Sequence, residues 1–546
     1  MISRRVVVIL IGALLRAASG SAQSSTTGAD RPLTLTQATE LALAHNLDIA
    51  VERVNVPAAD LQIAGIKAAY RPALNGLVGD LHQTSLPVTL LNGGPKVETN
   101  TATFNASLTD NVPWGGGAAS AAWNNNRVGS NSIFYNYNPA FNSSITFQYT
   151  QPLLRGFHTD AVRQQLVVTK ANRAISDLQL KATVANTLSS VRNAYWDLVF
   201  AVDSIDAAQK AVDLARDLVD ENQKRVAAGT MTELDLVSAR SQEATARHQL
   251  VAAEGNRRSA EVSLKRLLVG GADDPLWQTT LTPVDRPVLA NGPVDVDAAV
   301  RHALAERTDL AEAREQVTAN EASYKYLVDQ SRPQADLVGT YTIAGLGGTR
   351  IIRGGDPSFP INGPIIGTEP GSYGSAVNSL LGFNYPTWGI AVTMNYPLGL
   401  SAARADAARA RLQIDQVETE VHRLEVSVVT DVTTAAVNVR NNVDNVQTAI
   451  TARELAEQRL DAEQKRFVAG MSTNFQVVQA QKDLTDARNA ELQAEVTYRK
   501  SLVEFDRVQQ TTLQSSGVTL VSPSISVPAA GSGRAASAAP SGAFIQ

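Results

Sequence analysis

Two glycine turns with nearly the same sequence decide the fold: Lys224-Arg-Val-Ala-Ala-Gly229-Thr-Met and Lys465-Arg-Phe-Val-Ala-Gly470-Met-Ser. Each turn ends a stretch of roughly 70 residues without glycine or proline, which begins after Gly156 or after Gly399. At ~1.5 Å per residue, an unbroken helix of that length is about 105 Å long, far longer than the helices of compact domains. A second helical pattern follows each glycine, so the sequence predicts two long helical hairpins, at about 157–269 and 401–508.

The regions that precede the two hairpins also correspond, which indicates an internal duplication. Both begin with a short amphipathic helical pattern, at Leu33-Thr-Leu-Thr-Gln-Ala38 and at Val294-Asp-Val-Asp-Ala-Ala299. An Arg-Pro pair and a strand-like region follow in each case. The sequence therefore predicts two repeats, each with a short helix, strands and a helical hairpin. The first repeat spans 33–270, the linker spans 271–293, and the second repeat spans 294–510.

The strand-like regions, at about 75–151 and 335–396, alternate between polar and apolar side chains. Clear examples are Ser143-Ser-Ile-Thr-Phe-Gln-Tyr149 and Gly389-Ile-Ala-Val-Thr-Met-Asn-Tyr396. Alternating segments of ~9–11 residues match transmembrane β-strands, but a half-buried sheet of a soluble protein alternates in the same way. The strand pattern by itself leaves a membrane barrel and a soluble sheet equally open.

The two ends of the chain differ in composition from the repeats. Arg4 and Arg5, an apolar run at 6–15 and small residues up to Ala22 predict a signal peptide at 1–22, whose cleavage point stays open. No later segment has about 18 uninterrupted apolar residues, so any membrane-spanning part has to be a closed β-barrel. Residues 515–546 are rich in Ser, Ala, Gly and Pro, and we predict a disordered tail there.

The composition excludes several classes of function. The chain has 546 residues, a net charge of -5 and 0 cysteines, so it lacks a basic footprint for nucleic acid and thiolate ligands for metals. Its 6 histidines are scattered, and no His-x-x-x-His pair, Gly-x-Ser-x-Gly elbow or phosphate loop occurs. We therefore expect no enzymatic activity, no cofactor and no metal site.

The glycine turns and their surroundings resemble a known family over about 33–510. The most specific match is Lys465-Arg-Phe-Val-Ala-Gly470-Met-Ser-Thr-Asn-Phe-Gln-Val-Val-Gln-Ala480, and residues 224–240 repeat it. It is similar to the basic–aromatic–x–x–Gly–small turn of the TolC-like outer membrane factors. The Leu-Thr-Leu-x-x-Ala opening, the Arg-Pro pairs and the Gln-Pro-Leu that follows the first strand region are further points of resemblance. TolC-like proteins are the exit ducts of Gram-negative efflux pumps and type I secretion systems.

The resemblance implies an α+β membrane protein with two structural repeats that works as a homotrimer. Three copies would form one β-barrel in the outer membrane, surrounded by lipid, and one long periplasmic α-helical barrel. A periplasmic adaptor protein and an inner-membrane transporter would be its partners, and small molecules or proteins would pass through it passively. The alternative reading is a coiled-coil surface adhesin or a structural envelope protein. The cargo, the adaptor and the pump are not specified by the sequence.

The resemblance also implies that the two hairpin turns form a periplasmic tip that docks to the adaptor. The residues that match this tip are Gly229, Thr230, Met231, Gly470, Met471 and Ser472. A turn with little steric bulk presents exposed backbone to a partner helix, and the glycines cap their helices in any case. A narrow aperture is expected beside the tip, at Asp235, Gln476 and Gln479.

The aperture and the barrel both depart from the family pattern. Family members often carry aspartates shortly after the second glycine, where this chain has Gln476 and Gln479, so a polar constriction replaces an acidic ring. Asp235 fits a family position that pairs across helices to lock the closed state; a solvated helix face is the alternative. The family has four strands per protomer, and turn residues at Pro113-Trp-Gly-Gly-Gly117 would bring the number to six. We expect this extra hairpin to extend a loop or strand beyond the membrane.

Overall fold

The computed structural model describes residues 30–86, 95–286, 294–355, 363–396, 398–399 and 401–521. The predicted signal peptide at 1–22, residues 287–293 of the predicted linker and residues 522–546 of the predicted tail lie outside these ranges. The chain divides into two compact units, which are described separately. The first contains the described residues within 30–45, 194–286 and 453–493, and the second contains those within 46–193, 294–452 and 494–521.

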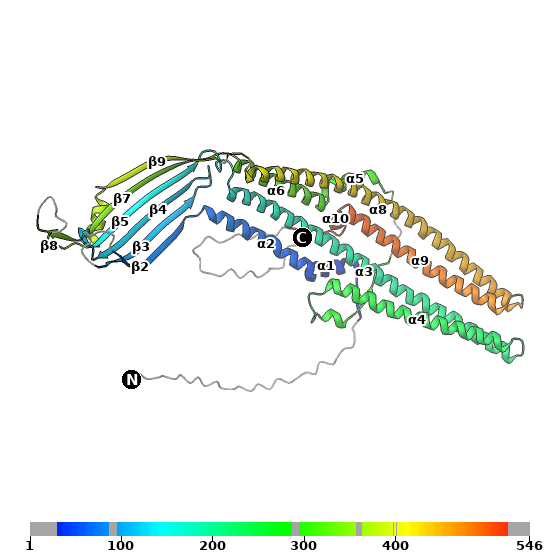
Figure 1. Cartoon of the computed structure of the whole chain (residues 1–546). Helices are drawn as coiled ribbons and strands as arrows, with labels where there is room; N and C mark the ends of the chain where they lie inside the picture. Colours follow the sequence, from blue (N-terminus) through cyan, green and yellow to red (C-terminus); the bar gives the residue numbers. More distant parts are fainter. Residues whose placement is uncertain are drawn as a thin grey trace, which may run out of the picture. The chain divides into compact units, whose positions relative to one another are not determined.

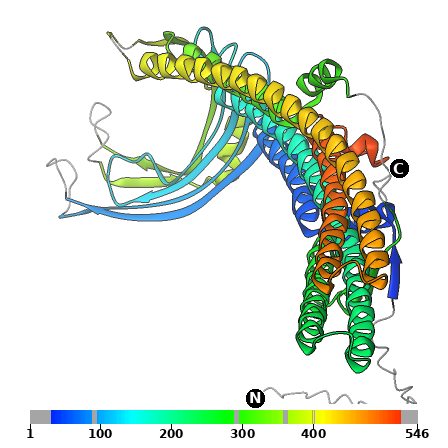
Figure 2. The ribbon, with the colours of Figure 1, turned by 90° about the vertical axis from the view of Figure 1, so that its right-hand side faces the viewer.

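The second unit is built on one antiparallel sheet (Figure 1), which Figure 2 shows to be strongly curved. Alternating side chains give each strand two different faces, and short turns fold consecutive strands back on each other. In spatial order the strands are β2 (Ala73–Ser85), β3 (Val97–Asn111), β4 (Ala118–Ser130), β5 (Tyr137–Pro152) and β7 (Gln334–Arg353), and β7 then pairs with both β8 (Ile365–Glu369) and β9 (Pro386–Asn395).

Every strand of this sheet except β8 has ten residues or more, so the described chain contributes six long strands. β2 pairs with β3 along its whole length, from Ala73↔Thr109 to Ser85↔Val97, and β3 pairs with β4 in the same plane. The hairpin around Gly115 therefore lies within the sheet as two paired long strands, joined by a tight turn in which the Val112 N–H donates to the Gly117 carbonyl at 2.7 Å. That the extra hairpin extends a loop or strand beyond the membrane stays a prediction.

The start of each repeat contains two helices, where the sequence pattern suggested one. Asn46 separates α1 (Leu35–His45) from α2 (Leu47–Lys67), because its backbone is extended and its side chain accepts from two N–H groups at the start of α2. The equivalent helices of the second repeat are α5 (Val296–Glu306) and α6 (Thr308–Gln330).

The glycine- and proline-free stretches form two helices of 67 residues each, α3 (Ala161–Ala227) and α8 (Ala402–Val468). A helix of this length extends over about 100 Å. After the glycine turns, α4 (Glu233–Leu268) and α9 (Asn474–Val508) complete the two hairpins. Within the described ranges, no helix is both long enough and apolar enough to cross a membrane.

Parts of the predicted linker and tail have regular structure. In the first unit, linker residues form a short 3-10 helix (Pro275–Gln278) and β6 (Thr280–Pro283), which pairs in parallel with β1 (Asp30–Leu33). In the second unit, the first tail residue, Ser515, is also the last residue of α10 (Thr512–Ser515). Its hydroxyl accepts a hydrogen bond from the Arg192 guanidinium at 3.2 Å.

Candidate functional site

The two hairpin turns of the first unit have the same backbone geometry. Gly229 and Gly470 lie in the left-handed region, at φ 73° and 74°. The N–H of Thr230 donates to the carbonyl of Arg225 at 2.9 Å, and Met471 N–H donates to the Arg466 carbonyl at 2.8 Å. These are Schellman caps, which satisfy the last carbonyls of α3 and α8. A Cβ atom on either glycine would meet no atom within 4 Å, so the backbone conformation, and not crowding, requires glycine.

The helix after each turn begins with an equivalent cap, which includes two of the predicted aperture residues. The Thr232 hydroxyl accepts from the N–H of Asp235 at 3.3 Å and donates to the Asp235 carboxylate at 2.6 Å. In the second hairpin, the N–H of Gln476 donates to the Thr473 hydroxyl at 3.4 Å, and the Gln476 side-chain carbonyl accepts from the Thr473 N–H at 3.3 Å. Gln476 therefore completes a capping box at the start of α9, whereas the Asp235 carboxylate supports the cap of α4 through the Thr232 hydroxyl.

The remaining polar residues beside the second turn are held within their own hairpin. The Ser472 hydroxyl lies 2.8 Å from carboxylate Oε2 of Glu463. The Gln479 amide donates to Asp483 at 2.7 Å, and the same carboxylate pairs with Arg459 at 2.6 Å. Gln479 is thus oriented by a neighbouring ion pair, which the sequence prediction did not include.

An apolar cluster joins the two hairpins behind the turns. Its centre is Phe467 from α8, which is only 5% exposed. Met231 and Leu236 from the first hairpin pack against the same cluster. Burial of these side chains stabilises the tip by the hydrophobic effect. The other buried members are Leu218, Val219, Ala239, Leu460, Val477, Ala480 and Leu484.

Polar contacts reinforce this junction. The Asn222 amide donates to the side-chain carbonyl of Asn474 at 2.8 Å, and both residues are buried. The Asn474 amide donates in turn to the backbone carbonyl of Asp235 at 3.2 Å. The Arg225 guanidinium lies 4.2 Å from the centre of the Phe467 ring and donates to the Phe467 carbonyl at 3.3 Å. The two turns are therefore fixed to each other, and the sequence prediction missed these residues because all of them act between repeats.

The two predicted docking methionines differ in environment. Met231 packs against the apolar cluster, whereas Met471 is 75% exposed. Exposed apolar side chains continue on the helices next to both turns, and Phe475 is 71% exposed. The sequence prediction did not include them, although their position within one or two helical turns of the glycines was a usable signal. These further residues are Leu234, Val237, Val468 and Phe475.

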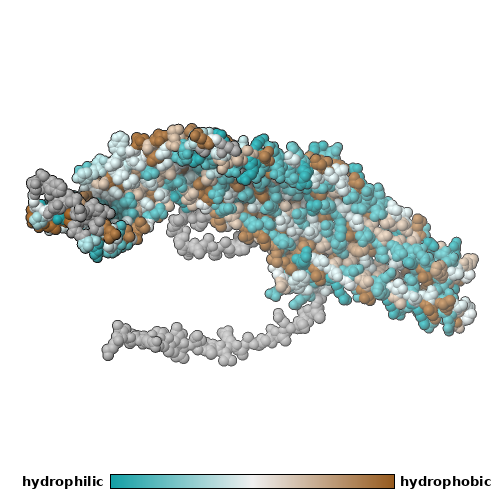
Figure 3. Space-filling model, in the orientation of Figure 1, coloured by the Kyte–Doolittle hydropathy of each residue, from teal (hydrophilic) through white to brown (hydrophobic). Residues whose placement is uncertain are grey.

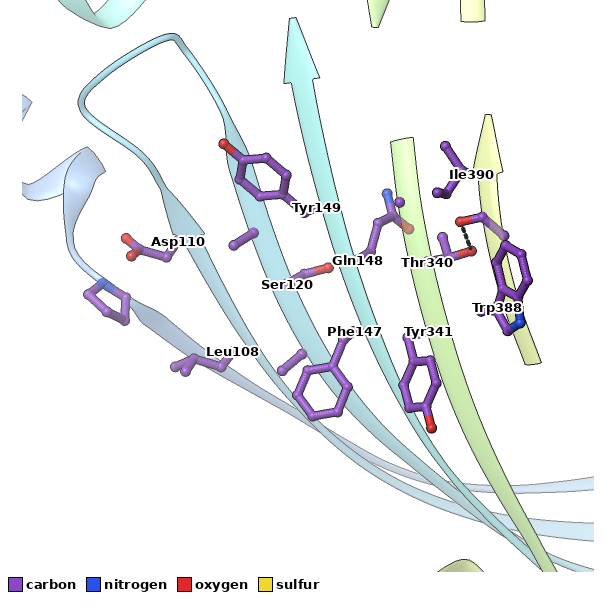
Figure 4. A pocket seen from close by; sticks show the side chains of 15 residues that line it. Leu108, Asp110, Ser120, Phe147, Gln148, Tyr149, Thr340, Tyr341, Trp388 and Ile390 are labelled. Atoms are coloured by element: carbon purple, nitrogen blue, oxygen red, sulfur yellow. Dashed lines mark hydrogen bonds between the residues drawn. The ribbon is translucent and has the colours of Figure 1, made fainter. Parts of the chain in front are cut away.

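A second functional surface is one face of the sheet in the second unit, which we call the apolar face. Phe147, Tyr341 and Trp388 are direct neighbours across β5, β7 and β9, and Figure 4 shows them in one row. They line a groove of about 710 Å³ together with Leu108 and Ile390. Figure 3 shows hydrophobic residues gathered over β9. The large apolar side chains that are exposed on this strand are Trp388, Ile390, Val392 and Met394. Apolar and aromatic side chains in this arrangement suit contact with lipid.

The opposite face of the same sheet, which we call the polar face, carries mostly uncharged polar side chains. Thr103, Asn105, Asn124, Thr146 and Thr340 belong to it by the two-residue period of their strands. The Thr146 and Thr342 hydroxyls lie 3.1 Å apart across β5 and β7. One apolar and one polar face is the arrangement of a sheet that has lipid on one side and water on the other.

Comparison with known proteins identifies the family. The family model described as "Outer membrane efflux protein" matches residues 38–270 and 299–508. No curated protein sequence matches the chain.

Several solved structures share the fold. The outer-membrane channel OprN has a TM-score of 0.63 at 15% identity, over 87% of this chain and 89% of that chain. The CmeC outer membrane channel of Campylobacter jejuni has a TM-score of 0.62 at 15% identity, over 88% and 89%. VceC, an outer membrane protein of Vibrio cholerae, has a TM-score of 0.60 at 14% identity, over 87% and 95%.

The two segments of the family match correspond to the two sequence repeats, and each includes one strand region and one helical hairpin. This match favours the duct over the surface adhesin. The chain belongs to the outer membrane efflux protein family: it is an outer-membrane exit duct with a periplasmic helical extension.

Proposed function

We propose that three copies of this chain form the duct, and that its tip docks to a periplasmic adaptor protein connected to an inner-membrane transporter. The observation that carries the docking proposal is the set of exposed apolar side chains beside the turns, above all Met471 and Phe475. Large apolar side chains that are mostly exposed and lie close together are typical of a surface that a partner covers. Cargo passes without chemical change, since the duct contributes a route and the transporter contributes the energy. The apolar face of the sheet contacts outer-membrane lipid.

The docking proposal predicts that Met471 in the second hairpin turn contacts the adaptor directly and that Met231 in the first turn does not. A photo-crosslinking amino acid in place of Met471 should capture a periplasmic adaptor in cells. The same probe in place of Met231 should give mainly crosslinks within the chain, because Met231 packs against the apolar cluster. Adding Phe475→Glu should reduce the Met471 adduct at least about tenfold, as expected when an apolar anchor is replaced by a charge. Mass spectrometry of the crosslinked bands measures both effects.

Val251 provides the matched control for Phe475. It is exposed to a similar extent on α4 but lies away from the turns, so Val251→Glu should leave the Met471 adduct unchanged. Circular dichroism checks that each variant keeps its helices. Strong adaptor capture from Met231 with none from Met471, or equal effects of the two glutamate substitutions, would contradict the proposal.

We also propose that Asp235, Gln476 and Gln479 surround the aperture of the closed duct, and that Asp235 acts there through its helix cap. Asp235→Ala removes the acceptor for the Thr232 hydroxyl, at a cost of about 1 kcal/mol for a lost cap contact. We expect the open population, and with it the single-channel conductance in lipid bilayers, to rise about fivefold. Asp235→Asn keeps an acceptor oxygen and should stay close to the wild type. An equal rise in both variants would show that the negative charge, and not the cap, closes the duct.

A further inference from the structure

The sheet of the second unit ends in two open edges. Within the described ranges, β2 pairs only with β3, and β9 pairs only with β7. Every residue of β2 is exposed, and so is every residue of β9 except Gly389. Unpaired backbone groups are costly in a hydrocarbon environment, so both edges need partner strands when the apolar face lies in lipid.

The direction of the strands identifies the partner as a second copy of this chain. Consecutive long strands alternate in direction across the sheet, and their number is even. The two edge strands therefore run in opposite directions. β9 of one copy can continue the antiparallel pattern on β2 of the next copy, and the apolar face continues across the junction. Bacterial outer-membrane barrels follow this even-numbered antiparallel rule.

The register supports the same junction. A single line of paired residues crosses the sheet from Ala73 on β2 to Gly389 on β9. A strand tilt of about 35–45° requires a stagger of about six to eight residues for every six strands. With that stagger, Val78 of one copy lies opposite Ile390 or Val392 of its neighbour. All residues of β9 then find partners on β2, whereas no stagger would leave most of them unpaired.

We propose that the barrel has eighteen strands, six from each of three copies, closed by β2–β9 pairing, and that its lumen takes bulky hydrophilic cargo as wide as a helical hairpin. This proposal rests on the trimeric duct proposed above. It departs from the twelve-stranded barrel that the family resemblance implies. In the rival arrangement, the β2–β3 hairpin turns away, and β4 forms the edge that meets β9 of the next copy.

The strand number sets the width of the duct. With strands ~4.8 Å apart and tilted by ~40°, eighteen strands give about 36 Å between opposite backbones, and twelve strands give about 24 Å. The side chains of each wall extend about half of the ~10 Å that separates packed sheets. Those of two opposite walls together therefore take up ~10 Å of either barrel diameter. The remaining ~25 Å admits two helices side by side, each ~10–12 Å wide. The narrower barrel admits only one helix.

The chemistry of the wall fits hydrophilic cargo. The polar face is dominated by threonine, asparagine and serine, which hydrogen-bond water and polar cargo without selecting a charge. The helix α7 (Tyr373–Leu381) does not obstruct this face, because it packs on the other one. A Cβ atom on Gly345 or Gly347, which share the face of Tyr341, would lie 2.1 or 2.4 Å from the α7 backbone.

Cysteine pairs test the closure, since the natural chain has 0 cysteines. Val78→Cys combined with Ile390→Cys or with Val392→Cys should give disulfide-linked dimers and trimers on gels after mild oxidation. Directly opposed residues of paired strands lie within the distance that a disulfide spans. The matched control is Val78→Cys with Ala391→Cys, which places the two thiols on opposite faces and should give at least about tenfold less product.

The rival barrel is tested with Ala121→Cys, on the apolar face of β4, combined with the same β9 positions. Disulfide-linked dimers and trimers from the Ala121→Cys pairs, with none from the Val78→Cys pairs, would overturn the eighteen-stranded barrel and leave the trimeric duct intact. If no cysteine pair gave disulfide-linked dimers or trimers and native mass spectrometry showed only monomers, the trimer proposed above would be overturned as well. A cryo-electron microscopy map of the wild-type trimer gives the strand count directly.

Access to the lumen tests the width. Asn124→Cys places a thiol on the polar face, and its neighbour Trp123→Cys places one on the apolar face. A maleimide attached to a helical-hairpin peptide ~20 Å wide should label Asn124→Cys on intact cells and leave Trp123→Cys unlabelled. Labelling of Asn124→Cys by a small maleimide but not by the hairpin reagent would contradict the proposed width.

Discussion

Phe467→Ala is expected to open the tip of the duct. The Phe467 side chain is the largest in the cluster that joins the two hairpins, and the Arg225 guanidinium lies 4.2 Å from the ring centre. Removing a buried phenylalanine costs about 3–5 kcal/mol, because apolar contacts are lost and a cavity remains. The cation–π contact adds a further ~0.5–2 kcal/mol. The hydrogen bond from Arg225 to the backbone carbonyl of residue 467 remains available, so the loss comes from the side chain.

The measurement is hydrogen–deuterium exchange of the peptides around both glycine turns. A local loss of about 3 kcal/mol corresponds to exchange more than a hundredfold faster. Single-channel recordings should show a parallel rise in open events. Val468→Ala is the control, because its side chain is 74% exposed and its loss should change local stability by no more than about 0.5 kcal/mol. If the two variants exchanged at the same rate, the apolar cluster would not be what fixes the hairpins to each other.

Sequence reasoning succeeded where the relevant signal is local. The two long helices follow from the absence of glycine and proline, and their ends follow from Gly229 and Gly470, whose positive φ angles require a residue without a Cβ atom. The caps of α4 and α9 were not predicted, although they also had a readable local pattern. Thr232 and Asp235 are three residues apart, as are Thr473 and Gln476, and this spacing is that of a capping box.

Sequence reasoning failed where the structure depends on contacts between distant segments. Alternation showed that strands were present around Gly115, but it does not report whether a hairpin stays in the plane of a sheet. The four-residue strand Thr280–Pro283 is too short for its alternation to be recognised, and its partner lies 250 residues away, at Asp30–Leu33. The contact of Arg225 with Phe467 likewise joins separate repeats, and nothing in either repeat alone indicates it.

A second large loss of stability in the first unit is expected from Tyr195→Ala. Tyr195 is 0% exposed and packs edge to face against Trp196, with the ring centres 5.7 Å apart. Its hydroxyl lies 3.0 Å from the carbonyl of Leu33 and 2.9 Å from the carboxylate of Asp285, and it accepts from the Asp285 N–H at 3.1 Å. The same carboxylate accepts from the N–H of Leu35 at 2.6 Å. Tyr195 therefore connects α3 to both segments that flank the β1–β6 pair.

Tyr195→Phe separates the hydroxyl from the ring. It keeps the packing but leaves buried polar groups without a partner, at an expected cost of about 1–3 kcal/mol. Tyr195→Ala adds a cavity and should cost about 3–5 kcal/mol. Thermal unfolding followed by circular dichroism measures both losses. Ser190→Ala, which removes an exposed hydroxyl from the same helix, is the control and should leave the melting temperature within a degree or two of the wild type.

The dependence of stability on pH provides a second readout for the hydroxyl. Burial raises the pKa of Tyr195 from 10.0 to about 12. Above pH 10 the unfolded chain loses this proton while the folded chain keeps it, so ionisation favours the unfolded state and stability falls as the pH rises toward 12. Tyr195→Phe has no proton to lose at this position, so its stability should fall less steeply than that of the wild type over this range. Equal slopes for the two proteins would mean that the Tyr195 hydroxyl is not buried against Leu33 and Asp285.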